Sequence, residues 1–116
     1  MIKNSFEQKF KDTYNLEYEP DRLDYTIVHK YTPDWKLTEN TYFETKGRWI
    51  SSDRSKIRAV LKQNPSVQIV MIFQNPKLKL SKSSKTTYSD FCDKHAIPWF
   101  DYKDTRGIKD FINRYK

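Results

Sequence analysis

The longest apolar run in the chain is the five-residue segment Ile69-Val70-Met71-Ile72-Phe73. It is far shorter than the roughly 20 apolar residues that a membrane-spanning helix needs. It lies within Val67–Gln74, where almost every position is apolar. A strand of this kind is covered on both faces, because a strand with one face in water alternates apolar and polar side chains. We therefore predict a buried strand inside a sheet that has helices on both sides.

The patterns around this strand predict an α/β chain. Apolar side chains three and four positions apart indicate helices, and short runs rich in β-branched and aromatic side chains indicate strands. The fold class is a mixed central β-sheet flanked by helices. In chain order we predict a helix from Ser5, strands at Leu16–Glu19 and Tyr25–His29, a hairpin of Tyr31–Leu37 with Thr41–Lys46, a helix from Ser51 or Ser52 to about Lys62, the strand Val67–Gln74, a helix after Thr87, a strand at Pro98–Asp101 and a helix after Gly107.

Two of these helices begin at a capping-box pattern. In the first, the Ser5 hydroxyl caps the first turn while Gln8 reaches back, and in the second Thr87 and Asp90 do the same. Between the buried strand and the second box lies Asn75–Lys85, which is rich in lysine and serine and is predicted to be a loop.

Length and composition limit the domain organisation and the chemistry. The 116 residues predict one domain over residues 1–116, and 36% hydrophobic with 16% aromatic residues predict a core of few, large side chains. The lone Cys92 excludes an internal disulfide and is predicted to be a buried thiol in a reducing compartment. Met1-Ile2-Lys3-Asn4 lacks the apolar core of a signal peptide, so we expect a soluble, intracellular protein without a membrane partner.

Positive charge is concentrated in the middle of the chain. Residues 1–47 have a net charge of −2, residues 48–85 a net charge of +8 and residues 86–116 a net charge of +1. The central segment holds one acid, Asp53. A concentrated positive field attracts a polyanion, and nucleic acid is the leading candidate; the alternative is a solvated, solubilising face. The basic residues of this segment are Arg48, Arg54, Lys56, Arg58, Lys62, Lys77, Lys79, Lys82 and Lys85.

Two carboxylates face each other across the predicted hairpin. If the hairpin is centred on Glu39, the numbers of paired residues sum to 78. Asp34 then lies directly opposite Glu44, with Cβ atoms about 5 Å apart. Carboxylates at that spacing repel each other, and a hard divalent cation removes the repulsion by binding both. The same register pairs Trp35 with Phe43 on the other face, where both are expected to pack in the core.

Lys46 stands two residues after Glu44, so alternation along the strand places it on the same face. An ammonium group there could position an attacking water or stabilise charge on a phosphate. The alternative is an ordinary exposed hairpin with a charge pair two residues apart. The +8 segment that follows at once favours an enzyme that cuts a polyanion with the help of a cation.

Other residues with possible chemistry are less informative. Glu7, beside the apolar stripe of the first helix, is read from its position alone as a first-turn glutamate that suits the helix dipole, or else as part of a second metal site. His29 and His95 are too isolated to indicate zinc. The chain has only two glycines and no glycine-rich phosphate loop, so no nucleotide cofactor is expected.

The order of short motifs along the chain resembles the phage endonuclease I family, the four-way-junction resolvases of lytic phages. The likeness covers roughly residues 5–101 in unbroken order. The motifs that carry it are Tyr31-Thr32-Pro33-Asp34, Glu44-Thr45-Lys46-Gly47 with Trp49, Ser52-Asp53-Arg54, Asn64-Pro65, Ile72-Phe73, Lys79-Leu80, Thr87-Tyr88 and Phe91-Cys92 with Lys94-His95.

The resemblance implies a site for metal-dependent DNA cleavage. The family is similar to the PD-(D/E)xK nucleases with a restriction-endonuclease-like fold, and its members cut branched DNA with Mg²⁺ or Mn²⁺, two ions to a site. Asp34 and Glu44 match its metal-binding carboxylates, Thr45 the residue whose carbonyl binds metal, and Lys46 its catalytic lysine. Glu7 matches the first-helix glutamate of the active site, which reverses the reading from position alone.

The resemblance also implies a homodimer whose two subunits exchange strands. In this chain the exchange falls on residues 16–31, a segment shorter than is usual in the family. If the exchange persists, Glu7 comes from one subunit and the other site residues from its partner. Two rival functions stay open, a catalytically silent branched-DNA-binding domain and a nuclease for mismatched, nicked or single-stranded DNA. The residues predicted to hold DNA phosphates are Arg48, Arg54, Lys56, Arg58, Lys77, Lys79, Lys82 and Lys85.

Overall fold

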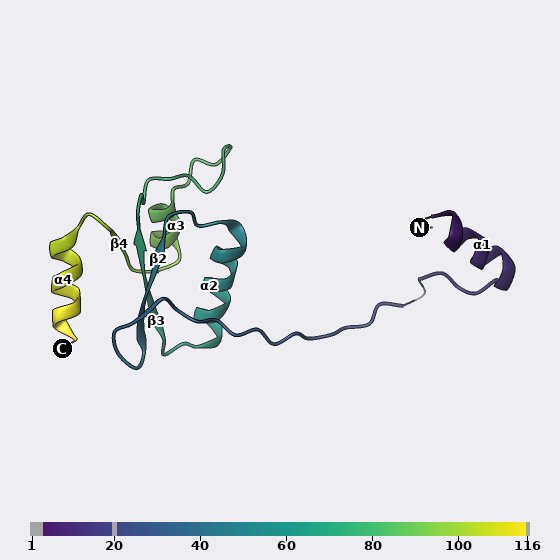
Figure 1. Ribbon diagram of the computed structural model, residues 1–116, viewed down its shortest axis with the longest axis horizontal. Coiled ribbons are helices and arrows are strands. Elements are labelled where there is room, and N and C mark those ends of the chain that lie inside the picture. Colours follow the sequence, from purple (N-terminus) through teal and green to yellow (C-terminus); the bar gives the residue numbers. More distant parts are fainter. Residues whose placement is uncertain (1–3, 20, 116) are drawn as a thin grey trace.

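The body of the molecule is a four-stranded mixed sheet, seen here in a computed structural model that describes residues 4–19 and 21–115 (Figure 1). The strands lie in the order β1-β2-β3-β4; β1 and β2 are antiparallel, and β2, β3 and β4 are parallel. This confirms the predicted α/β class. The strands are β1 (Trp35–Lys36), β2 (Thr41–Lys46), β3 (Gln68–Phe73) and β4 (Trp99–Asp101).

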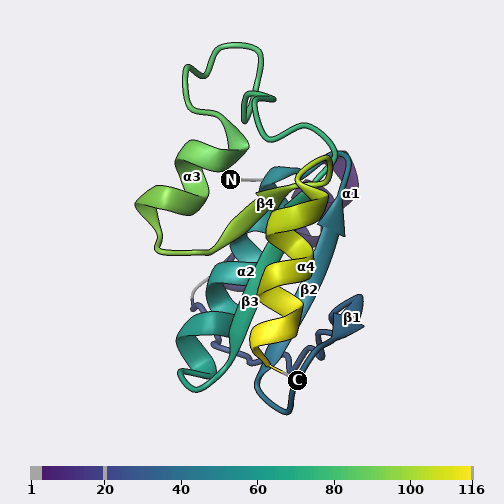
Figure 2. The same ribbon diagram turned by 90° about the vertical axis from the view of Figure 1, so that its left-hand side faces the viewer.

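Helices cover both faces of the sheet. α2 (Ser51–Gln63) and α3 (Tyr88–Lys94) lie on one face and α4 (Thr105–Arg114) on the other, as Figures 1 and 2 show. The Thr87 and Asp90 capping box is present at the start of α3. No helix in the described part of the chain is long and apolar enough to cross a membrane.

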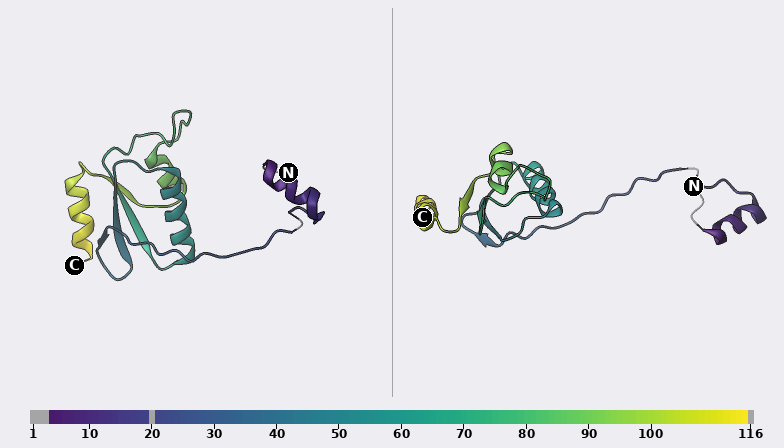
Figure 3. Two further views of the ribbon diagram at one scale, coloured as in Figure 1. Left: turned by 45° about the vertical axis from the view of Figure 1, so that its right-hand side comes forward. Right: turned by 90° about the horizontal axis from the view of Figure 1, so that it is seen from above.

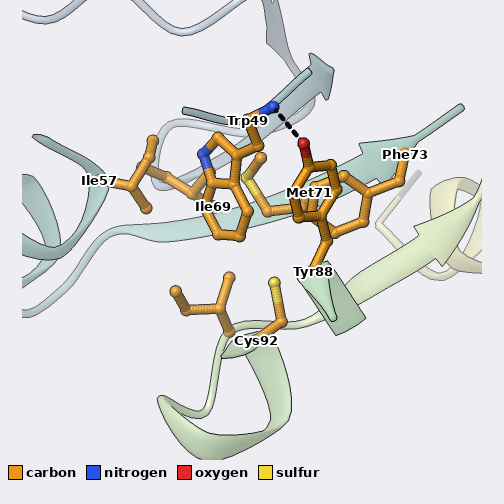
Figure 4. Packing of buried hydrophobic residues seen from close by; sticks show 8 residues of the cluster. Trp49, Ile57, Ile69, Met71, Phe73, Tyr88 and Cys92 are labelled. Carbon is orange, nitrogen blue, oxygen red and sulfur yellow. Dashed lines mark hydrogen bonds between the residues drawn. The ribbon is translucent and has the colours of Figure 1, made fainter. Parts of the chain in front are cut away.

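Strand β3 is the centre of the core, as its apolar run predicts. Ile69, Met71 and Phe73 belong to the cluster beneath α2 and α3, and Val70 and Ile72 belong to the cluster beneath α4. All five are buried, because each face of the strand has its own layer of helices. Figure 4 shows the first cluster, which also holds the buried thiol of Cys92.

Trp49 anchors the segment that joins β2 to α2. Its side chain is fully buried, and its backbone N–H donates a hydrogen bond of 3.1 Å to the hydroxyl of Tyr88 on α3 (Figure 4). The Arg54 guanidinium binds the Trp49 carbonyl and lies over the ring of Phe91. These contacts fix the start of α2 against α3, directly after the end of β2.

Helix α1 (Ser5–Tyr14) stands apart from this body, at the end of an extended segment (Figures 1 and 3). The radius of gyration is 21.9 Å, against roughly 13 Å for a compact domain of 100 residues. None of the α1 residues is buried, and residues 21–30 are all exposed. The exposed large hydrophobic side chains of this arm are Phe6, Phe10, Tyr14, Leu16, Leu23, Tyr25, Ile27 and Val28.

The predicted strands at Leu16–Glu19 and Tyr25–His29 are wrong for this single chain. Residue 20 of the segment 16–31 lies outside the described residues; the rest of the segment has no strand. A strand needs a neighbour to take its backbone hydrogen bonds, and the described chain offers this segment none.

The hairpin has the predicted register but a shorter first strand. Trp35 pairs with Phe43 and Lys36 with Tyr42, so paired numbers sum to 78. Only residues 35 and 36 of the predicted Tyr31–Leu37 strand pair with β2. The prediction that Trp35 packs in the core is also wrong: it is 60% exposed, because β1 is the edge strand and α4 covers only Phe43 of this pair.

Three helix starts differ from the sequence pattern. The cap of α1 is Asn4, whose side chain accepts from the Glu7 N–H, and not Ser5. Helix α2 begins after Ile50 without a side-chain cap. Helix α4 begins at Thr105, before Gly107, because the Asp104 carboxylate accepts from the Gly107 N–H at 3.0 Å. A Cβ on Gly107 would lie 2.2 Å from that carboxylate, so a larger residue here would displace the capping side chain.

Candidate active site

The hairpin brings Asp34 and Glu44 together at the carboxyl end of β2. The Asp34 N–H donates to Glu44 Oε1 at 3.0 Å. The Asp34 carboxylate accepts two hydrogen bonds from Thr45, at 3.0 Å from the backbone N–H and at 2.9 Å from the hydroxyl. The structure thus joins three of the residues predicted for the site, and the cause is the register of the hairpin.

The two carboxylates have different environments. Glu44 is only 4% exposed; burial raises its pKa, and the Tyr31 hydroxyl and the Asp34 N–H offset this only in part. Desolvation also opposes ionisation of Asp34, but the two hydrogen bonds from Thr45 outweigh it and hold the Asp34 pKa below its ordinary value. Glu44 is therefore a buried acid whose charge the protein groups compensate incompletely.

The Lys46 ammonium group lies between two carboxylates. Lys46 Nζ is 3.8 Å from Glu44 Oε2 and 3.9 Å from Asp53 Oδ2 on the first turn of α2. The side chains of Lys46 and Asp53 are 26% and 29% exposed. At these separations both carboxylates attract the Lys46 ammonium group, which stays accessible from solvent. The sequence pattern predicted no role for Asp53; that it is the single acid among nine bases makes it unusual but does not place it beside Lys46.

A cavity of about 250 Å³ opens beside these residues, lined among others by Asp34, Glu44, Lys46, Asp53 and Tyr31. The hydroxyl of Tyr31 is buried beside the Glu44 carboxylate. Burial and the neighbouring Glu44 carboxylate raise the Tyr31 pKa far above its ordinary value. The hydroxyl is therefore a neutral polar group beside the acid.

Glu7 is not part of this cavity in the single chain. It lies on α1, far from β2 in Figures 1 and 3, where its carboxylate accepts a hydrogen bond of 2.6 Å from the Tyr18 hydroxyl. Among residues 4–19 and 21–115, no three His, Cys, Asp or Glu side chains are grouped closely enough to hold a metal ion. Of the three acids predicted for the site, a single chain thus brings Asp34 and Glu44 together, while its own Glu7 lies on α1.

Most of the predicted phosphate-binding residues are exposed near this end of the sheet. Lys56 lines the cavity itself, and Arg48 lies two residues after the end of β2. Arg54 is half-buried and makes the internal contacts with Trp49 and Phe91 described above. The exposed members are Arg48, Lys56 and Arg58 and, in the loop between β3 and α3, Lys77, Lys79, Lys82 and Lys85.

Comparison with known proteins shows the family to which this chain is related. A model of the phage endonuclease I family matches residues 3–108. Endonuclease I of Escherichia phage T7 is 41% identical over 89 residues, which are 74% of this chain and 60% of that protein. Endodeoxyribonuclease 1 of Enterobacteria phage T3 is 40% identical over 89 residues, which are 74% of this chain and 59% of that protein. The chain spans about three fifths of the length of these relatives. It belongs to the phage endonuclease I family.

Proposed function

We propose that this chain is a structure-selective endodeoxyribonuclease that hydrolyses phosphodiester bonds in branched DNA, four-way junctions in particular. The observation that carries the proposal is the convergence of Asp34, Glu44 and Lys46 on one cavity at the carboxyl end of β2. The basic segment that begins at Arg48 borders this cavity and suits a DNA backbone. The relatives are phage proteins, and we place the activity in the cytoplasm of a host cell.

The donor set fits Mg²⁺, with Mn²⁺ as a substitute. Oxygen ligands suit both ions, and the buried Glu44 carboxylate is a negative group that its neighbours compensate only in part. We propose that Asp34, Glu44 and the backbone carbonyl of Thr45 hold one ion and that Glu7 and Asp34 hold a second. When bound, these ions supply Lewis-acid stabilisation of the charge on the phosphate.

The protein's own groups have separate tasks in this proposal. Lys46, held between Glu44 and Asp53, carries the positive charge that stabilises the phosphate as its bond to the leaving oxygen breaks. The N–H and hydroxyl of Thr45 fix the direction of the Asp34 carboxylate. Lys56 and the other exposed bases hold the phosphates on either side.

We propose that the active unit is a strand-exchanged homodimer. Helix α1 has ten residues, fewer than the roughly 12–15 that an isolated helix needs to be stable in water. It carries the apolar ring pair Phe10 and Tyr14 into solvent, and the extended segment after it is equally exposed. A second copy of the chain would cover both and would bring its Glu7 to the pair Asp34 and Glu44.

Cleavage of an immobile four-way junction tests the enzyme, beside a linear duplex that has the same arms. We expect cuts near the branch point in Mg²⁺, none in EDTA, and a loss of rate on the order of 10²-fold or more in Lys46→Ala and Glu44→Ala. Asp110→Ala, on the outer part of α4, serves as the matched control. Binding of the junction without cleavage in either metal would contradict the proposal and leave a silent DNA-binding domain.

Mixing two inactive variants tests the shared site. Glu7→Ala and Lys46→Ala proteins are unfolded together and refolded, so that mixed dimers form. In an exchanged dimer one of the two sites then holds an intact Glu7 and an intact Lys46, and junction nicking returns. If both residues of each site come from one chain, every site keeps one substitution, and the mixture stays as inactive as its components.

A further inference from the structure

A second cavity adjoins the candidate active site above the ends of the three parallel strands. It has a volume of about 310 Å³ and is lined by Thr45, Lys46, Gly47, Ile72, Gln74 and Tyr102. Lys46 ends β2, Gln74 follows β3 directly, and Tyr102 follows β4 directly. The crevice outside the carboxyl ends of parallel strands is where open α/β sheets bind their ligands. The volume is at the lower end of the range for small-molecule sites, roughly 300–1,000 Å³.

Lys46 belongs to both cavities. A phosphate bound by Lys46 in the first cavity would therefore lie next to the second cavity. Gly47 also lines the second cavity, so position 47 adds no side chain to its wall. A Cβ at that position would lie 3.1 Å from the Gln74 side chain. The two cavities thus meet at Lys46, at the carboxyl end of β2.

Tyr102 presents its ring to solvent from a fixed backbone. The side chain is 68% exposed, and it is not among the described residues that form the hydrophobic cluster beneath α4. Its N–H donates to the Phe73 carbonyl at 2.8 Å, and the turn that follows is closed by a bond of 2.9 Å from the Asp104 N–H to the Asp101 carbonyl. An exposed aromatic ring on a rigid turn at the rim of a cavity can stack against a planar ring of a ligand.

The chemistry of this cavity suits a nucleobase. Every base has a π-face that can stack on an aromatic side chain, and the exposed amide of Gln74 can both donate to and accept from a base edge. The cavity holds no carboxylate, so it is not built for a metal ion or a cation. Its one charged group, Lys46, faces the phosphate that such a base would carry.

We propose that this second cavity is a subsite for an unstacked nucleobase next to the phosphodiester that is cut, with the ring of Tyr102 as its stacking surface. The inference rests on the proposed nuclease function and adds a reason for selectivity. In an intact duplex both faces of each base are covered by neighbouring base pairs. A base can therefore stack on the Tyr102 ring only where base stacking within the DNA is interrupted, as it is at a branch point.

Photocrosslinking tests the contact directly. A four-way junction carries 5-iodouracil in place of thymine at the nucleotide that flanks the cut site, and the protein binds it in EDTA so that no cleavage occurs. We expect irradiation to give a crosslink that peptide mapping assigns to Tyr102, that persists in Tyr102→Phe and that is lost in Tyr102→Leu. A crosslink to Trp35, the exposed ring on β1, or no crosslink to any residue of the cavity would overturn the assignment.

Kinetics separate this inference from the proposed function. We expect Tyr102→Leu, which keeps apolar bulk without a ring, to lower kcat/KM on the junction about tenfold and Tyr102→Phe to match the unaltered protein. Tyr115→Leu, an exposed tyrosine at the end of α4, is the control. If the unaltered protein cuts junctions and both Tyr102 variants cut equally well, the subsite is wrong and the nuclease stands. If the unaltered protein does not cut, the proposed function itself fails.

Discussion

The backbone N–H of Asp34 donates a hydrogen bond to the carboxylate of Glu44, with 3.0 Å between Asp34 N and Glu44 Oε1. The bond crosses the hairpin, so the register of β1 with β2 fixes the spacing of the two acids. Burial disfavours the ionised form of Glu44 in spite of this bond, whereas hydrogen bonds from Thr45 favour the ionised form of the exposed Asp34. A bound cation would remove the cost of the buried charge on Glu44, so this arrangement suits a cation-binding site.

Glu44→Gln is expected to stabilise the metal-free protein at neutral pH. The folded-state pKa of Glu44 lies above its ordinary value of 4.5. Its contribution to stability is therefore fully present below pH 4.5 and is lost as the pH rises through the folded-state value. Glutamine stays neutral and can still accept from the Asp34 N–H. We expect urea titrations in EDTA to give a higher free energy of unfolding for Glu44→Gln at neutral pH.

Two further measurements check that prediction. The difference between the two proteins should shrink when the pH falls below 4.5, since both then carry a neutral side chain. Addition of Mg²⁺ should raise the melting temperature of the unaltered protein more than that of Glu44→Gln, because binding to the folded state alone stabilises it. A variant less stable than the original at neutral pH in EDTA would contradict the prediction.

The core and the hairpin register could be predicted from the sequence because local patterns determine them. The apolar run Ile69–Phe73 identifies a strand covered on both faces, and the polar turn Thr38-Glu39-Asn40 centres the hairpin on Glu39, which sets Asp34 opposite Glu44. The Thr87 and Asp90 capping box is equally local. In each case the residues that decide the structure are neighbours in sequence.

The errors lie where the structure depends on something outside the local pattern. Tyr25–His29 has the composition of a strand, but composition does not supply a partner strand, and within one chain the segment stays extended and exposed. The role of Trp35 depends on how far α4 reaches across the sheet. The approach of Asp53 to Lys46 depends on how α2 packs, so its position in the site could not be predicted from charge counts.

Asp53 is expected to act as a positioning residue for Lys46. Its carboxylate lies 3.9 Å from Lys46 Nζ and draws the ammonium group toward α2. We expect Asp53→Asn to lower kcat on a four-way junction between about 10- and 100-fold, because small misplacements of a reacting group are costly, and to leave KM within twofold. Restored activity in Asp53→Glu and normal activity in Asp110→Asn complete the test. An unchanged kcat in Asp53→Asn would remove this role.

Tyr88→Phe is expected to destabilise the fold without touching the site. The Tyr88 hydroxyl accepts the hydrogen bond of the buried Trp49 N–H, so its loss leaves a buried donor unpaired. An unpaired buried donor costs about 1–3 kcal/mol. Urea denaturation measures this loss, and Tyr102→Phe, whose hydroxyl is on an exposed side chain, is the matched control with no change expected. Equal midpoints for both variants would show that the Trp49 bond contributes little.

Lys56 is expected to hold a DNA phosphate at the rim of the candidate active site. It lines the cavity that contains Asp34, Glu44 and Lys46, and its side chain is exposed on the first half of α2. We expect Lys56→Ala to weaken junction binding and to reduce the slope of log affinity against log salt by about 1, the value for one lost phosphate contact. Lys109→Ala, on α4, has the same change of charge away from the cavity and should keep the original slope. Equal slopes for Lys56→Ala and the unaltered protein would place the DNA backbone elsewhere and would direct attention to the lysines of the loop between β3 and α3.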